Sequence, residues 1–426
     1  MNTPSSDDAP ALARAPAILV MLGAGALFVV AAAVLVPWSW IPGGELVPAA
    51  PSDVFTVEEI QRAEEFSTQR RYLNLASYFL SLLIALVLGL TPLGARLVRR
   101  LTGSRAWWVA VPIGVVALLL VGRVVTLPLS AFIHELNLDY GLSNQSWGAW
   151  GVDVLKSFGV GMVLTSLVLL VLVACALRSP RWWFAWAGGL SALLVVAASF
   201  LYPVVVEPIF NKFTPMSAGP FKASVFELAE SEGVQVDDVL VADASRRTTT
   251  LNAYVSGFGG TRRVVVYDNL LKELSPDEAR VVIAHELAHA KHRDVLVGTV
   301  LGGVGGVAGL ALLALLLDSR RLRRRAGVAG PADPAAIALV LALSATGTFL
   351  SSPVLNTISR AVEVRADRDS IAATGQGDVF GEMQHELAVH SLSDPTPPQL
   401  NHFWFGSHPT VLQRVGIPAS LEGASR

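Results

Sequence analysis

Long apolar stretches alternate with polar segments along most of the chain. Seven stretches are close to the roughly 20 residues that a helix needs to cross the hydrocarbon core of a bilayer. They cover Ala17–Ile41, Leu75–Leu93, Trp107–Leu129, Phe158–Leu177, Trp183–Val205, Val295–Leu317 and Ala335–Pro353. This pattern predicts a mainly α, multi-pass membrane protein with about seven transmembrane helices.

The polar segments between the spans divide the chain into parts. We expect four: 1–205 with five transmembrane helices, 206–294 as a region of soluble composition, 295–353 with spans six and seven, and 354–426 as a C-terminal segment. A first loop at about 42–72 is acidic, with a helical centre over Val57–Arg71, and its role cannot be assigned from the sequence.

The region 206–294 has the pattern of a small mixed fold. The spacing predicts one helix, a short strand and a hairpin joined through glycines, at Phe221–Glu232, at Val239–Val241, and at Leu251–Val255 with Arg263–Tyr267. Ser275 to Glu278 reads as a capping box with proline at the first helical position. The helix that starts there is expected to continue through Arg293 into the sixth span, so its residues lie at the membrane boundary.

That helix carries His285, Glu286 and His289 in the pattern H-E-x-x-H. Residues four apart lie one turn apart on the same helix face, so both imidazoles can bind one zinc ion. Glu286 is close enough to take a proton from a water at that ion. The alternative is a buried amphipathic helix with incidental histidines.

A catalytic zinc site needs a third protein ligand. Glu363 is the best candidate, and Asp367, one turn later, would accept a hydrogen bond from a ligand histidine and fix its tautomer. The alternative for Glu363 is a solvated carboxylate paired with Arg360. The segment around it is expected to continue the seventh span as a helix.

The other histidines fit a metal site less well. His385 and His390 are five residues apart, which leaves their rings about 140° apart on a helix. His292 is expected near the ligands or at the membrane surface, and His134 and His402 have no informative spacing.

Composition supports a membrane protein and limits the ligand types. The 426 residues are 52% hydrophobic and only 15% charged, against about 25% charged in a typical soluble domain. The net charge of −2 gives no argument for nucleic-acid binding. Cys175 is the single cysteine, so a metal here must use histidines and carboxylates. Arg123 lies inside the third span, facing either a hydrated interior or the interface.

Several motifs occur in a fixed order among the spans: Asn252-Ala253-Tyr254, H-E-L-A-H at 285–289, S-R-x-x-E-x-x-A-D at 359–367 and S-H-P-x-x-x-x-R at 407–414. With Tyr202-Pro203, Phe210 to Phe213 and Tyr140 to Ser143, they closely resemble the type I CAAX prenyl protease family of integral-membrane zinc proteases and its HtpX-type bacterial relatives. The resemblance covers nearly the whole chain.

The resemblance implies a gluzincin-like zinc protease domain at one membrane face and transmembrane helices around a chamber. It implies one Zn(II) held by His285, His289 and Glu363, with Glu286 as general base and Asp367 behind a ligand. By the same resemblance, Asn252, Ala253 and Tyr254 form the edge strand that pairs with substrate backbone, and His408 and Arg414 approach the substrate carbonyl or terminal carboxylate.

Charge indicates which side the protease region faces. Eleven arginines follow spans two, four and six: Arg96, Arg99, Arg100, Arg105, Arg178, Arg181, Arg320, Arg321, Arg323, Arg324 and Arg325. Four basic residues follow spans one and three: Arg62, Arg70, Arg71 and Lys156. The positive-inside rule therefore predicts an extracytoplasmic protease region in a cell membrane. The eukaryotic members of the resembled family work from the cytosolic side, so the two expectations disagree.

The expected function is a zinc endopeptidase that cuts membrane-associated peptides or proteins, in CAAX-type processing or in membrane protein quality control. A transporter or receptor with a regulatory zinc site is the alternative, and an inactive scaffold that keeps the motif is a third. Substrate and lipid bilayer are the expected partners; the oligomeric state is not predicted.

Overall fold

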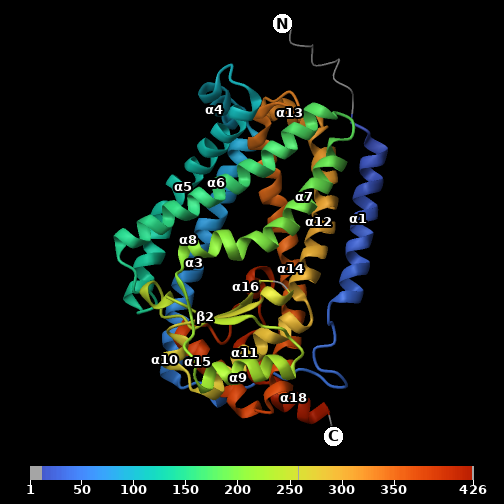
Figure 1. Cartoon of the computed structure of the whole chain (residues 1–426). Helices are drawn as coiled ribbons and strands as arrows, with labels where there is room; N and C mark the ends of the chain where they lie inside the picture. The colour runs from blue at the N-terminus through green and yellow to red at the C-terminus, as the bar shows by residue number, and fades with distance from the viewer. Residues whose placement is uncertain (1–11, 258, 425–426) are drawn as a thin grey trace.

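The computed structural model describes residues 12–257 and 259–424 of the chain. Seven described helices are long and apolar enough to cross a membrane, as the hydrophobic pattern predicts (Figure 1). They are α1 (Arg14–Leu35), α3 (Val57–Leu90), α5 (Trp107–Asp139), α6 (Trp147–Arg178), α7 (Trp183–Leu201), α12 (Asp294–Leu317) and α14 (Ile337–Thr374).

Several of these helices are longer than the apolar stretches that predicted them. The helix expected in the acidic loop and the second span are one helix, α3, which starts at a capping box of Thr56 and Glu59. Its 34 residues rise about 50 Å, well beyond a hydrocarbon core of about 30 Å. α14 likewise runs without a break across the expected segment boundary at 353–354. These long helices therefore continue without a break from the membrane-spanning part of the molecule into the region outside it.

Six of the long helices form a closed ring. In the order α3, α5, α6, α7, α12 and α14, each helix contacts the next, and α14 contacts α3 again. α1 packs on the outside of this ring against α12 (Figure 1).

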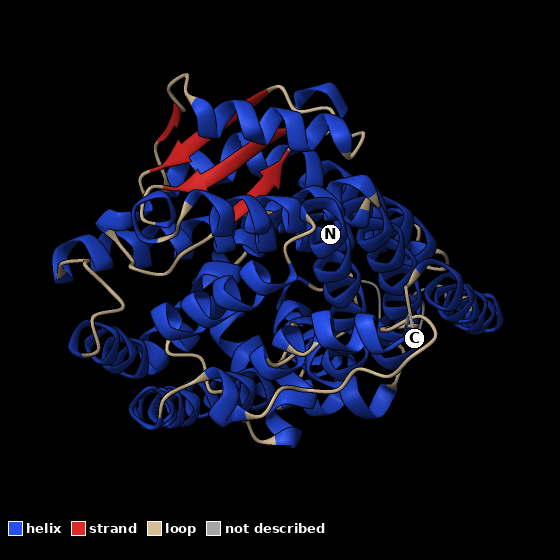
Figure 2. Ribbon diagram, turned by 90° about the horizontal axis from the view of Figure 1, so that it is seen from below, coloured by secondary structure: helices blue, strands red, loops and turns tan. Residues whose placement is uncertain are grey.

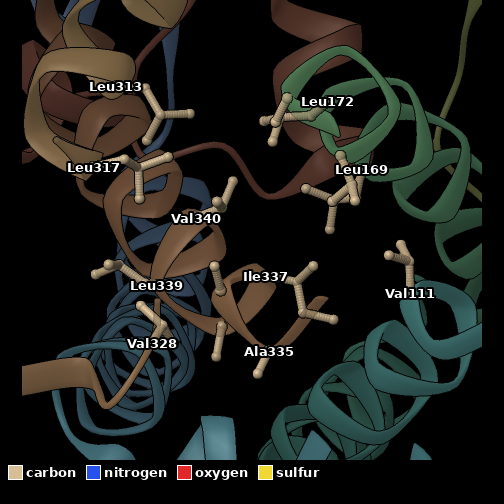
Figure 3. Packing of buried hydrophobic residues seen from close by; sticks show 14 of the residues in the cluster. Val111, Leu169, Leu172, Leu313, Leu317, Val328, Ala335, Ile337, Leu339 and Val340 are labelled. Carbon is tan, nitrogen blue, oxygen red and sulfur yellow. The ribbon is translucent and has the colours of Figure 1, made fainter. Parts of the chain in front are cut away.

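The end of the ring near the short helices α4 (Pro92–Thr102) and α13 (Arg320–Ala326) is closed by packing (Figures 1 and 3). Side chains from α5, α6, α12 and α14 meet there in one buried cluster, which includes Val111, Leu169, Leu172, Leu313, Leu317, Ile337, Leu339 and Val340. Fully burying one such side chain stabilises the fold by about 1.5–3 kcal/mol. The opposite end of the ring carries the protease region.

A small sheet lies at one side of the molecule in the view from below (Figure 2). Its strand order is β1-β2-β4-β3, with β2 and β4 parallel and the other neighbours antiparallel. The strands are β1 (Phe213–Pro215), β2 (Asp238–Ala242), β3 (Ala253–Ser256) and β4 (Arg263–Tyr267). The predicted hairpin is confirmed by β3 and β4, and β3 is an edge strand. The three-residue strand β1 was not predicted, because so short a segment has no periodicity.

Helix α11 (Pro276–Lys291) packs between the edge strand β3 and α14. It begins at the predicted capping box, in which Ser275 accepts from the Glu278 backbone and the Glu278 carboxylate accepts from the Ser275 backbone. Its apolar face joins the core beneath the sheet, where Ile283 and Leu287 are fully buried.

The prediction that α11 continues into the sixth span is wrong. α11 ends at Lys291, Arg293 adopts a left-handed conformation with φ of 56°, and α12 begins at Asp294. A residue with positive φ ends the α-helical path, so the chain changes direction between the motif helix and the membrane helix.

The first loop, whose role the sequence left open, docks on the end of the chain. The backbone amide of Ala49 donates to the Leu412 carbonyl at 2.9 Å, and that of Val47 donates to the Ser420 hydroxyl at 3.1 Å. A Cβ added at Gly416 would lie 2.1 Å from the Val47 carbonyl oxygen, so only glycine allows this approach. The loop thus packs against α17 (Val411–Val415) and α18 (Ile417–Ala424).

Candidate metal centre

Helix α11 presents both motif histidines to one point. The Nε2 atoms of His285 and His289 lie 3.2 Å apart, and the two rings are nearly perpendicular. His285 is buried, whereas His289 is partly exposed. The four-residue spacing therefore places the two imidazoles as predicted.

Helix α14 brings Glu363 to the same point. Glu363 Oε2 lies 3.3 Å from Nε2 of His285, and Oε1 lies 3.7 Å from Nε2 of His289. One potential ligand atom from each of these three residues lies within 4.8 Å of the other two. In this geometry Glu363 does not pair with Arg360, which instead donates to the Gly406 carbonyl at 2.6 Å.

Two further carboxylates contact the Nδ1 atoms of the two histidines. Nδ1 of His285 lies 2.8 Å from Asp367, and Nδ1 of His289 lies 2.9 Å from Asp294. A carboxylate only accepts hydrogen bonds, so each Nδ1 carries the proton and each Nε2 exposes a lone pair. The Nε2 lone pairs therefore converge with Glu363 as three acceptors without a donor between them.

This acceptor cluster, formed by His285, His289 and Glu363, fits a bound cation. Glu363 Oε2 is buried and makes no hydrogen bond among the described residues, a costly state for a carboxylate oxygen. Burial opposes a charge on His285, but the adjacent carboxylates of Asp367 and Glu363 outweigh it and raise the pKa of its imidazole to about 10. The surroundings thus favour positive charge, and two imidazoles with one carboxylate are a ligand set that zinc accepts.

Asp294 was not identified from the sequence. On a continuous helix it would lie about 140° around the axis from His289, because five residues separate them. The break at Arg293 returns it to His289, and Arg365 of α14 donates a hydrogen bond to its other oxygen. Neither glycine nor proline marks this break, so the sequence held no signal for it.

Arg414 occupies a different place from the one expected. Its Nε and Nη2 donate to the two oxygens of Asp367 at 2.8 and 2.5 Å, behind His285. Arg414 therefore supports the carboxylate that orients His285, while His408 faces the site. Nε2 of His408 lies 3.4 Å from Glu363, and its side chain is 57% exposed.

Glu286 lines the cavity that contains the acceptor cluster. Burial raises the pKa of its carboxyl, and the neighbouring charges of His285 and His289 offset part of that rise. A carboxyl with a raised pKa can both accept and return a proton near neutral pH.

The edge strand borders the metal centre. A cavity of about 550 Å³ is lined by Glu286 and His408 together with the three residues expected to bind substrate, Asn252, Ala253 and Tyr254. The Tyr254 hydroxyl donates to Glu207 of α8 (Glu207–Phe210) at 3.3 Å. Asn252 itself precedes β3, which begins at Ala253.

The remaining histidines lie outside the acceptor cluster. His385 lies beside Glu59 and Glu386, and His390 lies 3.7 Å from Glu386, so neither shares a metal with the site. His292 pairs with Asp369 at 2.5 Å. The other two have different surroundings: His134 stacks with Trp150, and His402 contacts the His408 carbonyl.

Two family profiles match adjoining parts of the chain. The profile "CAAX prenyl protease N-terminal, five membrane helices" matches residues 43–212, and "Peptidase family M48" matches residues 216–417. The second match contains the complete acceptor cluster and the carboxylates behind it.

Curated relatives support the same assignment. YhfN of Bacillus subtilis, described as a metalloprotease, is 27% identical over 381 residues, 88% of this chain and 89% of YhfN. CAAX prenyl protease 1 of Saccharomyces cerevisiae is 31% identical over 39% of this chain and 37% of its own length. The homolog of Dictyostelium discoideum is 31% identical over 62% of this chain and 61% of its own. The chain thus matches less than two thirds of the length of these two eukaryotic relatives.

The fold is shared with a solved structure. The crystal structure of S. mikatae Ste24p matches with a TM-score of 0.78 and 20% identity, over 94% of this chain and 98% of that one. Sequence profiles, relatives and fold agree, and the acceptor cluster lies where a metallopeptidase needs it. The chain is a membrane metalloprotease of the CAAX prenyl protease type, and its residues 216–417 match peptidase family M48.

Proposed function

We propose that the chain is a zinc-dependent endopeptidase that cuts membrane-associated peptides or proteins. The observation that carries the proposal is the convergence of His285, His289 and Glu363, with Glu286 beside them. One zinc ion per chain would be held by these three residues. When bound, zinc lowers the pKa of a water ligand and polarises the scissile carbonyl.

The protein side chains supply the proton transfers. Glu286 takes a proton from the attacking water and returns it to the leaving amine, which its raised pKa favours. His408 lines the same cavity and is placed to stabilise negative charge that develops on the carbonyl oxygen. Asp367 and Asp294 keep both imidazoles in the ligating tautomer.

The substrate is an extended peptide that adds to the edge of the sheet. Among the described residues β3 has a partner strand on one side only, so its other edge offers backbone groups to a peptide. Asn252, Ala253 and Tyr254 line the cavity beside Glu286 and would hold that peptide. Two relatives carry the name CAAX prenyl protease, so C-terminal processing and membrane protein quality control are the substrate classes to compare.

Zinc content and cleavage of a peptide library by the purified protein test this proposal. We expect a chelator to stop cleavage and Glu286→Gln to abolish it while zinc stays bound. Glu230 is an exposed carboxylate on α9 (Pro220–Ser231), so Glu230→Gln is the matched control. This variant should cleave normally. Undiminished cleavage by Glu286→Gln would refute the mechanism.

A further inference from the structure

One face of the membrane helix α3 carries a regular polar stripe. Its members are spaced three and four residues apart and therefore share one side of the helix: Ser67, Arg70, Asn74, Ser77 and Ser81. The opposite side carries Tyr72, Phe79 and Leu83, which are 69%, 47% and 56% exposed. Apolar side chains on that side suit lipid, so the polar stripe faces the interior of the helix ring.

The stripe lines a cavity of about 810 Å³ between α3, α14 and α16 (Gln399–Phe405). Thr348 of α14 and Asn401 of α16 add further hydrogen-bonding groups to its wall. Tyr78 and Phe405, whose rings are 5.5 Å apart, form an apolar part of the same wall. The wall therefore offers hydrogen-bonding groups for a peptide backbone and apolar surface for peptide side chains.

Arg70 brings an uncompensated charge into this cavity. Its neighbour Arg71 is neutralised by Asp394 at 3.0 Å and also donates to Thr68. Arg70 has no carboxylate or hydrogen-bond partner within the described ranges 12–257 and 259–424. Its guanidinium lies 5.6 Å from the ring centre of Phe66, a contact that positions the cation and leaves its charge free.

The cavity adjoins the metal centre through α16. Phe405 lines the cavity, and three residues later His408 lies 3.4 Å from Glu363. Three residues span at most about 11 Å of extended chain. α16 is fixed to α14, because Asn356 donates to the Trp404 carbonyl at 2.6 Å. The wall of the cavity at Phe405 therefore lies within about 11 Å of His408 at the metal centre.

We propose that the cavity is a substrate subsite in which Arg70 binds a carboxylate of the peptide. The carboxylate is either the free C terminus or an acidic side chain, since a guanidinium fork binds both in the same way. This inference rests on the proposed peptidase function and adds a preference for substrates with negative charge.

Peptides of one cleavable sequence, differing only in charge, test the proposal. The terminal pair compares a free acid with an amide, and the side-chain pair compares glutamate with glutamine beyond the cleaved bond. We expect the wild type to favour one charged member by about 10–100-fold in kcat/KM, the range of a charged hydrogen bond. Arg70→Gln should lose that preference, and Arg70→Lys should retain part of it.

The matched control replaces the ion pair as a unit: Arg71→Gln combined with Asp394→Asn leaves the net charge of the cavity unchanged and should keep the wild-type preference. Thermal unfolding of each variant separates loss of fold from loss of recognition. A preference that survives in Arg70→Gln, or that the wild type lacks, overturns the subsite.

Binding of the same peptides to Glu286→Gln tests Arg70 without catalysis. Charge-selective binding that Arg70→Gln abolishes in this background supports the subsite, and equal binding of charged and neutral peptides overturns it. An absence of cleavage by the wild type refutes only the peptidase function, so the two failures are distinguishable.

Discussion

Each imidazole in the metal centre is held from behind by its own carboxylate. His285 is held by Asp367, which two nitrogens of Arg414 support, and His289 is held by Asp294, which Arg365 supports. In both arrangements an arginine donates hydrogen bonds that orient the carboxylate. The geometry of the two ligands therefore depends on residues that never contact the metal.

Replacing Asp294 should weaken metal binding. Asp294→Ala removes the acceptor at Nδ1 of His289, so we expect zinc affinity to fall about 10–100-fold, as for other carboxylates behind a ligand histidine. Competition with a chromophoric chelator measures this directly. Asp369→Ala, which removes the partner of His292 outside the cluster, should leave affinity unchanged. Equal affinities for both variants would contradict the role of Asp294.

The pH dependence should report Glu286. A general base must be ionised, and burial raises the pKa of this carboxyl above 4.5. Activity should therefore be full well above that raised pKa and be lost as the pH falls through it, which places the acid limb of kcat/KM above pH 4.5. Zinc content measured at each pH separates this limb from metal loss. Full activity at pH 4.5 with zinc bound would disagree with the prediction.

Local spacing identified part of this centre in advance. His285, Glu286 and His289 follow from helix geometry, because residues four apart share a face. Glu363 and Asp367 follow from the need for a further ligand and from the family resemblance. Asp294 does not, because its position depends on an unmarked left-handed residue, and Arg414 was assigned to the substrate because its pairing with Asp367 is long-range.

At the scale of elements, the first loop and the C-terminal helices form one unit. Val47 and Ala49 bond to residues of α18 and α17, and α17 carries Arg414. The loop therefore supports the metal centre indirectly, through the position of Arg414 behind Asp367.

An added methyl group at Gly416 should separate the first loop from α17 and α18. Gly416→Ala places a Cβ about 2.1 Å from the Val47 carbonyl, and such overpacking costs about 1–3 kcal/mol of stability. We expect a lower thermal midpoint and faster proteolysis of the loop. Gly423→Ala, with nothing within 4 Å of the added Cβ, is the control. A wild-type midpoint for Gly416→Ala would show that the loop does not depend on this contact.

Helices with a strong local sequence pattern could be predicted, but the connections between successive helices could not. All seven spans appear as helices because a long apolar run is itself the signal. The union of the loop helix with the second span in α3 and the break before α12 were missed, since both depend on packing with distant segments.

At the scale of the molecule, the ring of helices has two unlike ends. The sheet and metal centre lie at one end, and α4 and α13 with their arginines lie at the other (Figure 1). Opposite ends of a ring that spans the bilayer face opposite compartments. The order of the helices around the ring could not be predicted, because hydropathy says nothing about which spans are neighbours.

Cysteine labelling should determine the orientation. Cys175 is buried, so an impermeant thiol reagent on intact cells reports only introduced cysteines. Following the positive-inside rule, we expect Gln235→Cys in the protease region to react before lysis and Ser104→Cys in the loop after α4 to react only after it. Both residues are exposed. The reverse result would place the metal centre in the cytoplasm.

The metal centre also sets when during synthesis the protein can act. The motif histidines lie before the sixth span, whereas Glu363, His408 and Arg414 follow along α14 and beyond. The ribosome must therefore synthesise the seventh span and the segment that carries His408 and Arg414 before the metal centre is complete. A nascent copy that still lacks these segments cannot cleave a peptide bond.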